Sequence, residues 1–362
     1  MRAAQYSGSS GPTLRHEASS NSLVELRLDD PRWMDLAAVA PAATVFHLPA
    51  WHHVISDTYG YRSALLVNLD HWGRVMAGVP AIRVRRLRGQ VWVSLPFSDH
   101  CPLLARDDEG LRSLAVALVN WSRQQDVPLE LRSTLPDTPG WHPTVLGTRH
   151  VLPLGAGLDA LRQRVGRQHS RWLRHAERGD LRVRFGRSLH DVEAFYQLHI
   201  MTRRRLGIPV QPRRFFRSVW QHVIRPRLGL VVLVETPAQQ PVAGAVLFTW
   251  NRTAIVKFQA SDASSWRRRP NHLLYWAALR RAEEDGYQLF DFGRSDIDHR
   301  GLQDFKAGWG AEAIPLVYAL THPSTPAPGR RGPVEGAMRQ IIRHSPAVVC
   351  RALGSVFYRY VA

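Results

Sequence analysis

"TAIVKFQASDASSWRRRPNHLLYWAALRRAEEDGYQLFDF", residues 253–292, contains a strand, a helix and a second strand, in that order. Thr253–Ser261 and 288–292 are short apolar runs rich in β-branched or aromatic residues, a pattern typical of strands. Residues 271–285, which lie between them, have the length and composition of a helix. Such alternation predicts a mixed α/β fold.

The alternation continues on both sides of this stretch. We predict further strands at 22–28, 63–70, 74–84, 91–97, 128–133, 181–185, Gly229–Glu235, Pro241–Trp250 and 313–320. We predict further helices at Pro31–Val39, 51–57, 109–125, 158–178, Leu189–Leu206 and 213–228, with a short helix near Asp304. The proline-containing segment 133–143 is the best candidate for a break between two α/β halves.

The predicted organisation has four parts, and no sequence repeat relates the two halves. Residues 1–21, rich in serine and glycine, are expected to be a disordered leader. Residues 22–147 form a first domain and residues 148–322 a second, catalytic domain. Residues 323–362 are interpreted as a Pro/Gly linker and a basic amphipathic helical tail, which is more typical of a docking helix than of a membrane anchor.

The chain of 362 residues is strongly basic, with 48 Lys and Arg against 30 Asp and Glu and a formal net charge of +18. Such an excess favours an anionic partner, such as nucleic acid, a nucleotide-linked substrate or an acidic membrane surface. Two cysteines form neither a disulfide framework nor a metal cluster, which suits a reducing cytoplasm. Because no run of 18 apolar residues occurs, we expect a cytoplasmic protein, with peripheral contact at the inner face of the plasma membrane left open.

Several common chemistries have no motif in the sequence. It contains no G-x-S-x-G, H-E-x-x-H, C-x-x-C or Walker A motif, and no metal site is expected. "GAGLDA", residues 155–160, is similar to a dinucleotide-binding G-x-G-x-x-A. No acidic residue ends the next predicted strand, however, and the helix behind it is crowded with arginine, so we do not favour a dinucleotide site.

Arginines recur at spacings of three and four within the predicted helix 158–178, which would place them on one face: Arg164, Arg167, Arg171, Arg174 and Arg178. A different face, able to pack on the core, would hold Leu161, Val165, Trp172 and Ala176. Like charges at this spacing repel unless an anion neutralises them. Arg167, Arg171 and Arg174 are therefore candidates to bind phosphates of RNA or of a nucleotide-sugar, and a solvated surface is the alternative.

Lysine occurs at only two positions, Lys257 and Lys306, in a chain with 48 Lys and Arg. Lysine is a compact point charge on a flexible stem, which suits a crowded pocket better than the wider, planar arginine. Both lysines are therefore candidates for a substrate pocket, and a chance, solvated side chain is the alternative.

An ordered series of motifs resembles the Fem family, the aminoacyl-tRNA-dependent peptidyltransferases that build interpeptide bridges in peptidoglycan. The series lies within residues 46–318 and comprises "SLPFSDHCPLL", "RWLRHAERGDLRV", "FYQLHIMTRRRLGIP", "VKFQASD", "PNHLLYWAAL", "DFGRS" and "FKAGWG". The resemblance implies two tandem domains of the Gcn5-related N-acetyltransferase (GNAT) type, with the acyl acceptor in a cleft between or along them. The helical-hairpin arm of some family members has no counterpart here, so tRNA contacts through such an arm are not assumed.

The resemblance also implies where the acyl ester is held. The Phe-Lys pair of the family corresponds to Phe305 and Lys306. The lysine would supply positive charge to the oxyanion or to a neighbouring phosphate, and the phenylalanine would exclude water or stack on the terminal adenine.

Further site residues follow from their types and positions. Asp99 is a candidate proton acceptor or amine-orienting group, and His100 is a weaker alternative. The alternatives without a catalytic role are that Asp99 caps a turn and that His100 is a surface residue. For Asp291 we expect a structural hydrogen bond. Substrate contacts are expected from Lys257, Arg294, Ser295, Arg203 and Arg204.

The reaction implied by the resemblance needs neither a covalent nucleophile nor a cofactor, because an aminoacyl ester is already activated. The expected partners are aminoacyl-tRNA and an amine-bearing acceptor, such as a peptidoglycan precursor, an exopolysaccharide amine or a small metabolite. The acceptor could be anionic, nucleotide-linked or lipid-linked. One alternative is an acyl-CoA-dependent N-acyltransferase, although "WRRRPNHLL" lacks the glycines of a CoA pyrophosphate loop and Pro270 removes an N–H donor. Another is a non-catalytic scaffold that binds anionic glycolipid.

Overall fold

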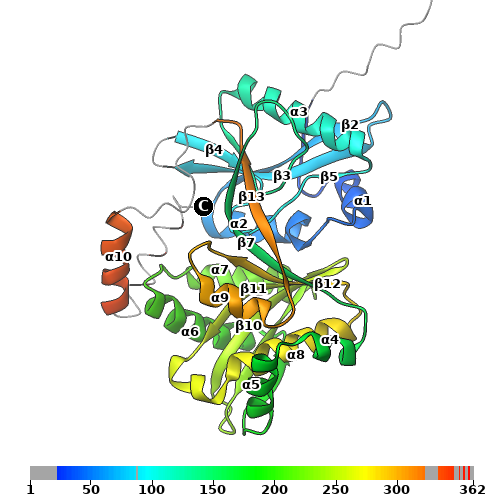
Figure 1. The fold of residues 1–362 in the computed structure, drawn as a ribbon. Helices are drawn as coiled ribbons and strands as arrows, with labels where there is room; N and C mark the ends of the chain where they lie inside the picture. Colours follow the sequence, from blue (N-terminus) through cyan, green and yellow to red (C-terminus); the bar gives the residue numbers. More distant parts are fainter. Residues whose placement is uncertain are drawn as a thin grey trace, which may run out of the picture.

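The computed structural model describes residues 23–86, 89–322 and 333–345, together with Cys350, Gly354 and Tyr358. The predicted leader, 1–21, and the linker, 323–332, lie outside the described residues. Strands and helices alternate along the described chain, so the predicted mixed α/β fold is confirmed (Figure 1).

The elements of the described chain have the following bounds. The strands are β1 Val24–Leu26, β2 Arg62–Leu69, β3 Val75–Arg86, β4 Gly89–Val93, β5 Leu104–Ala105, β6 Leu129–Leu131, β7 His142–Pro153, β8 Arg182–Gly186, β9 Gly229–Glu235, β10 Pro241–Trp250, β11 Thr253–Ser261, β12 Leu289–Ser295 and β13 Glu312–Leu320. The α-helices are α1 Pro31–Val39, α2 Pro49–Tyr59, α3 Asp108–Gln125, α4 Leu158–Arg164, α5 Arg167–Glu177, α6 Leu189–Leu206, α7 Arg213–Val219, α8 Pro270–Glu284, α9 Arg300–Ala307 and α10 Pro333–His344.

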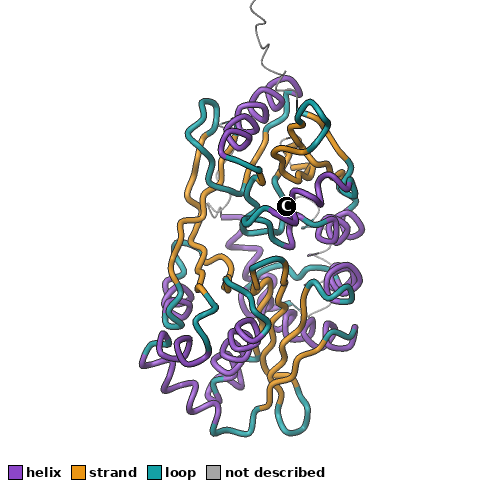
Figure 2. The backbone as a smooth tube through the Cα atoms, turned by 90° about the vertical axis from the view of Figure 1, so that its right-hand side faces the viewer, coloured by secondary structure: helices purple, strands orange, loops and turns teal. Residues whose placement is uncertain are grey.

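One mixed sheet runs through both halves of the molecule, in the order β1-β2-β3-β4-β6-β13-β7-β12-β11-β10-β9-β8. Strand β13 lies between β6 and β7, because Ala319 pairs with Leu131 on one side and Leu320 pairs with His142 on the other. Figure 1 shows β7 and β13 passing side by side from one half to the other, and strands also join the halves in the turned view of Figure 2. Hydrogen-bonded strands thus connect the two halves.

A hydrophobic core also crosses the boundary between the halves. The ring of Trp51, on α2, lies 6.0 Å from that of Phe215 on α7 and 5.3 Å from that of Phe248 on β10. All three side chains are fully buried. Because aromatic side chains bury roughly 150–250 Å² each, this cluster makes a large contribution to holding the halves together.

Helices cover both faces of the sheet in the second half. Along β10, Val246 joins the core on the side of α6, whereas Ala245 and Leu247 join the core on the side of α8. A strand that is buried on both faces needs a continuous apolar run rather than strict alternation, as β9 and β10 have. The sequence of these two strands therefore predicts that both lie inside the sheet rather than at its edge.

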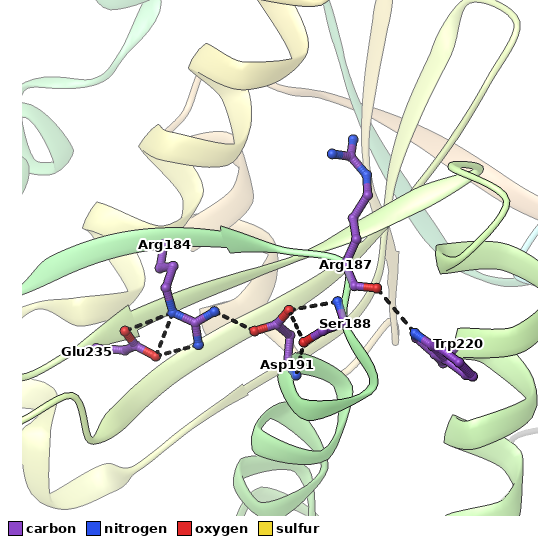
Figure 3. A network of polar contacts seen from close by, with 6 residues as sticks. All are labelled: Arg184, Arg187, Ser188, Asp191, Trp220 and Glu235. Carbon is purple, nitrogen blue, oxygen red and sulfur yellow. Dashed lines mark hydrogen bonds and ion pairs between the residues drawn. The ribbon is translucent and has the colours of Figure 1, made fainter.

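A charged network fastens β8, at the edge of this sheet, to its neighbours (Figure 3). Arg184 donates to both carboxylate oxygens of Glu235 on β9 and to Asp191 on α6. Asp191 also accepts from the backbone N–H and the hydroxyl of Ser188, at 2.8 and 2.6 Å, and Ser188 is the N-cap of α6. These bonds fix the start of α6, whose other end carries Arg203 toward the site described below.

Three predicted elements differ from the structure. The predicted helix 158–178 is two helices, because Val165 leaves the helical conformation and Gly166 follows it. The predicted helix 213–228 consists of α7 and a π-helical turn over Trp220–Ile224. The predicted strand 91–97 ends at Val93, since Leu95 and Phe97 adopt left-handed backbone conformations, with φ of 66° and 62°.

The predicted helical tail is present as α10, which packs on α6. Ile342 of α10 is fully buried. Farther along, the hydroxyl of Tyr358 donates to the carbonyl of Pro209, at 3.0 Å, and its own carbonyl accepts from the hydroxyl of Tyr61, at 3.1 Å. Tyr358 therefore touches both halves. Within the described ranges, no helix has both the length and the apolar character that a membrane span requires.

Candidate active site

The candidate site lies where two neighbouring strands separate. Strands β11 and β12 pair in parallel only at their beginnings, Thr253 to Ile255 against Leu289 to Asp291. Beyond this point a cavity of about 410 Å³, here called the central cavity, opens between them. Its walls include residues 256–259 of β11, 292–294 of β12, Lys306 of α9, and Phe97 and Asp99 from the first half.

Strand β12 is kinked at Gly293, whose φ of 74° is readily adopted by glycine. Its pairing with β7 changes register between Asp291 and Arg294, as expected of a β-bulge. The kink turns two peptide groups toward ionic side chains. The N–H of Gly293 donates to Oδ1 of Asp291 at 2.7 Å, and the backbone of Arg294 lies near the carboxylate of Asp99, where it helps to lower the pKa of Asp99. The carbonyls of the same two residues accept from Lys306.

Lys306 is only 3% exposed. Its Nζ donates to the carbonyl oxygens of Gly293, at 2.7 Å, and Arg294, at 2.9 Å. An ammonium group has three N–H donors, so one donor remains beyond these two bonds. Burial lowers the pKa of Lys306 to about 8, although the neighbouring carboxylates oppose this effect. The side chain is thus a fixed cation in the cavity wall that loses its proton more easily than an ordinary lysine.

Lys257 and Asp99 form an ion pair across the two halves, with Nζ and Oδ2 3.8 Å apart. The Lys257 ammonium also lies over the rings of Phe46, Trp51 and Phe258, at 5.4, 5.9 and 5.5 Å from their centroids. Burial lowers the pKa of Lys257, whereas Asp99 raises it. Burial also disfavours the charged form of Asp99, but the surrounding cations outweigh this and hold its pKa below the usual value. Asp99 is therefore an ionised acceptor within the cavity wall.

The loop that carries Asp99 is held in a strained shape. Its two left-handed residues, described above, cost on the order of 1–3 kcal/mol each, so the surrounding contacts must hold them in place. Arg132 donates to the carbonyl of Ser98 at 2.7 Å, and the hydroxyl of Tyr318 donates to the carbonyl of Asp99 at 3.2 Å. Arg132 in turn pairs with the fully buried Glu130. The loop is thereby fastened to β6 and β13.

Phe305 lines an adjoining cavity at the start of α8 rather than the central one. This cavity, here called the helix-end cavity, measures about 680 Å³. Its walls combine aromatic and basic side chains: Trp266, Arg205, Arg269, His272 and Phe305. The two cavities adjoin, since both are lined by Gln259, Tyr275, His299 and Leu302. Phe305 and Lys306, neighbours in sequence, therefore serve different cavities.

The other predicted substrate contacts divide into two groups. Arg203 and Arg294 line the central cavity. Arg203 donates to the hydroxyl of Tyr358, so the C-terminal segment contacts a residue of the site. Ser295 is buried and Arg204 is exposed at the end of α6, and neither belongs to the described walls of the two cavities.

The predicted arginine face is interrupted by the break between α4 and α5. Arg164 belongs to α4 and donates to the carbonyl of Pro153, whereas Arg167, Arg171 and Arg174 are exposed on α5. Leu161, Val165 and Ala176 are buried as predicted.

Trp172 was predicted to pack on the core, but the buried residue at this place is Leu173. Trp172 is half-buried, and the guanidinium of Arg269 lies 3.5 Å from its ring centroid. Because Arg269 lines the helix-end cavity, the arginine surface of α5 begins beside that cavity.

The glycines of "GAGLDA" bind a side chain of the protein itself. The backbone N–H groups of Gly155 and Gly157 donate to the two carboxylate oxygens of Glu283, at 2.8 and 2.6 Å. Glu283 belongs to α8, so these donors fasten the start of α4 to that helix.

The sequence reasoning missed several residues of the central cavity: Phe97, Gln211, Gln259, Tyr275 and His299. One signal was available, because Gln259 follows Lys257 by two positions on a strand, and side chains at that spacing share a face in a regular strand. Gln211 and Tyr275 come from segments whose orientation depends on tertiary packing, and no local pattern marks them.

The comparisons with known proteins agree with this architecture. Residues 161–307 match the family described as acetyltransferase (GNAT) domain, and the chain is an acyltransferase of the GNAT fold. Its fold is, more particularly, that of FemX. The crystal structure of FemX matches with a TM-score of 0.64 at 13% identity, covering 82% of this chain and 96% of that chain. The expected Fem-like fold is thereby confirmed.

Two further structures share the fold. The C-terminal domain of a putative lysylphosphatidylglycerol synthetase from Agrobacterium fabrum matches with a TM-score of 0.51 at 14% identity, covering 81% of this chain and 91% of that one. L-PGS from Bacillus licheniformis matches with a TM-score of 0.51 at 10% identity, covering 82% and 95%. Among curated proteins, questin oxidase of Aspergillus fumigatus is 31% identical over 110 residues, 27% of this chain, and the chain spans 25% of that protein's length.

Proposed function

We propose that the protein transfers an aminoacyl group from a charged tRNA to an amine of a cell-wall precursor, a polysaccharide or a small metabolite. The observation that carries this proposal is the central cavity, where an ionised carboxylate and two buried ammonium groups are held together: Asp99, Lys257 and Lys306. Such a set can hold a cationic amine next to a carbonyl that develops negative charge.

Each of these groups has a distinct task in the proposed reaction. Asp99 binds the ammonium of the acceptor and takes up its proton, which leaves a nucleophilic amine. The remaining N–H of Lys306 faces the carbonyl oxygen of the ester, where the oxyanion forms. Lys257 keeps Asp99 ionised. The amide bond forms as the ester C–O bond breaks, and no covalent enzyme intermediate is needed.

The helix-end cavity favours tRNA over CoA as the donor. Helix α8 begins after a left-handed Arg269 and with Pro270, which has no N–H. The N–H groups of His272 and Leu273 are directed at the carbonyl of Arg269, at 3.1 and 3.4 Å. A CoA pyrophosphate requires free N–H groups at a helix start, and few remain here. Aromatic rings and guanidinium groups, in contrast, suit a terminal adenosine and its phosphates.

Two alternatives remain in the proposal. Acyl-CoA-dependent N-acylation, for example in exopolysaccharide synthesis, is supported by the match to the acetyltransferase (GNAT) domain. A non-catalytic, glycolipid-binding scaffold would use the basic surface alone. The Agrobacterium neighbour is named as a putative lysylphosphatidylglycerol synthetase, and the product in that name is a lipid that carries an aminoacyl group. We therefore include lipid-linked acceptors among those to be tested, with the protein in the cytoplasm or in contact with the inner face of the plasma membrane.

A comparison of the two donors, supplied separately, distinguishes among these functions. The protein is incubated with a cell extract as acceptor source and either tRNA charged with labelled amino acids or labelled acyl-CoA, with and without ribonuclease. We expect label transfer from charged tRNA, abolished by ribonuclease. Transfer that requires acyl-CoA and is unaffected by ribonuclease would establish acyl-CoA-dependent N-acylation. The absence of transfer from either donor would support the non-catalytic scaffold.

A further inference from the structure

A smaller cavity of about 170 Å³, here called the side cavity, lies next to the paired part of β11 and β12. Its walls include Thr253 and Ile255 of β11 and Asp291 of β12, together with the exposed residues Pro41 and Ala42. One water molecule needs roughly 10–15 Å³ of cavity volume, so the side cavity has room for several water molecules. The exposed wall residues place it at the surface.

Asp99 lies between the side cavity and the central cavity. Of the described residues that line either cavity, Asp99 is the one common to both. A Cβ atom at Gly293 would lie 3.4 Å from Oδ2 of Asp99, and the N–H of Gly293 donates to Asp291 at 2.7 Å. Two carboxylates therefore flank one backbone position. Asp99 lines the central cavity as well as the side cavity, whereas Asp291 lines only the side cavity of the two.

The proposed reaction produces a proton that must leave the site. An acceptor ammonium and an ester become an amide, an alcohol and one proton. Two N–H bonds of the ammonium break heterolytically. The electron pair of the first stays on the nitrogen and forms the bond to the carbonyl carbon, and its proton is the one released. The proton of the second ends on the oxygen of the leaving alcohol as the ester C–O bond breaks. Bound donor and acceptor displace the water of the central cavity, so the proton needs a second way to solvent.

We infer that Asp291 and the side cavity form this exit: Asp99 takes the proton from the acceptor, Asp291 receives it, and water in the side cavity carries it away. The inference rests on the proposed acyl transfer. Asp291 acts through Asp99 and does not touch the substrate.

The charges around Asp291 support this direction of transfer. Burial raises the pKa of Asp291, and it outweighs the lowering effects of Arg149 at 3.6 Å, of the hydrogen bond from Gly293 and of Lys306. Asp99 has a pKa below its usual value, so a proton on Asp99 moves downhill to Asp291. The charged or titratable groups around the pair are Arg132, Arg149, Arg294, Lys257, Lys306, Tyr318 and His100. Burial lowers the pKa of His100 to about 3, so this ring stays neutral.

Asp291→Asn separates proton transfer from structure. Asparagine keeps an oxygen for the N–H of Gly293, so the kink in β12 is retained, but its amide cannot take up a proton. With charged tRNA and the extract, we expect kcat to fall on the order of tenfold or more while both KM values stay unchanged. The solvent deuterium isotope effect on kcat should increase. The matched control is Asp304→Asn, at an exposed carboxylate of α9, which should behave as the wild type.

Two further variants distinguish the exit from a structural role. Asp291→Ala should recover part of its kcat when formate is added, because this small carboxylate can enter the vacated space. Ala42→Leu, at the exposed wall, should lower kcat and raise the isotope effect without touching either carboxylate. Unchanged kcat and isotope effects in Asp291→Asn and Ala42→Leu, with wild-type transfer intact, would overturn the inference alone. Absence of transfer by the wild type would overturn the proposed function, and the inference with it.

Discussion

The ammonium of Lys306 lies 2.7 Å from the carbonyl oxygen of Gly293, the residue at which β12 kinks. The contact satisfies a carbonyl at the kink, and it fixes a positive charge at the wall of the central cavity. A buried carbonyl without a partner costs about 1–3 kcal/mol, so this lysine contributes to the fold as well as to the site.

Substitutions of Lys306 should separate charge from shape. Lys306→Ala removes the donor, and we expect kcat to fall by roughly 10²–10³, as for the loss of one preorganised donor. Lys306→Arg keeps the charge, but the guanidinium is wider and directs its donors differently. We therefore expect the arginine variant to fold and to have a strongly reduced kcat. Steady-state kinetics and thermal unfolding measure both effects. Wild-type turnover in the arginine variant would mean that charge alone suffices, and wild-type turnover in the alanine variant would remove Lys306 from the mechanism.

The lowered pKa of Lys306 predicts how stability depends on pH. Between about pH 8 and 10.5, the usual pKa of lysine, the unfolded chain binds more protons at this residue than the folded protein does. The free energy of unfolding of the wild type should therefore rise across this window relative to Lys306→Met, by on the order of 3 kcal/mol. Denaturant unfolding at several pH values checks this. Parallel pH profiles for the two proteins would show that Lys306 titrates as an ordinary lysine.

Lys257 should determine the pH at which the carboxylate of Asp99 becomes protonated. Lys257→Met keeps a side chain of similar length but removes the ammonium 3.8 Å from Asp99. Burial then acts on Asp99 with less opposition, and its pKa should rise. We expect the acidic limb of the kcat/KM profile to move to higher pH. An acidic limb at the wild-type position would show that a group other than Asp99 controls it.

The arginine surface of α5 should bind phosphates of the donor. Replacing Arg167, Arg171 and Arg174 together by glutamine should raise the KM for charged tRNA and flatten its dependence on salt. A matched triple variant removes the same charge from exposed arginines of the first half: Arg85, Arg112 and Arg123. If both triple variants change KM equally, net charge rather than the α5 surface attracts the donor.

The sequence predicts those parts of the fold that depend on local pattern. Leu189–Leu206 and Thr253–Ser261 are the observed bounds of α6 and β11, because apolar periodicity and turn residues mark their ends. Asp99, Lys257 and Lys306, which the motif resemblance and the scarcity of lysine marked as candidates, all line the central cavity, and their roles stay predictions.

The remaining features depend on contacts between distant segments. No local rule predicts left-handed leucine and phenylalanine at positions 95 and 97, because that loop is held by Arg132, just after β6, and by Tyr318 of β13. The different directions of Phe305 and Lys306 likewise follow from how α9 packs. Trp172 was misplaced because its neighbour Leu173 also fits an apolar helical face.

The position of β13 between β6 and β7 has a consequence for the synthesis of the chain. The ribosome makes β6 at 129–131 but reaches its partner only at 319–320. At about 5–20 residues per second, the edge of the first half's sheet waits on the order of ten seconds or more for its neighbour. An unpaired strand edge can join other chains. The first half made alone would keep that edge open, so it should be more prone to association with other chains than the full chain.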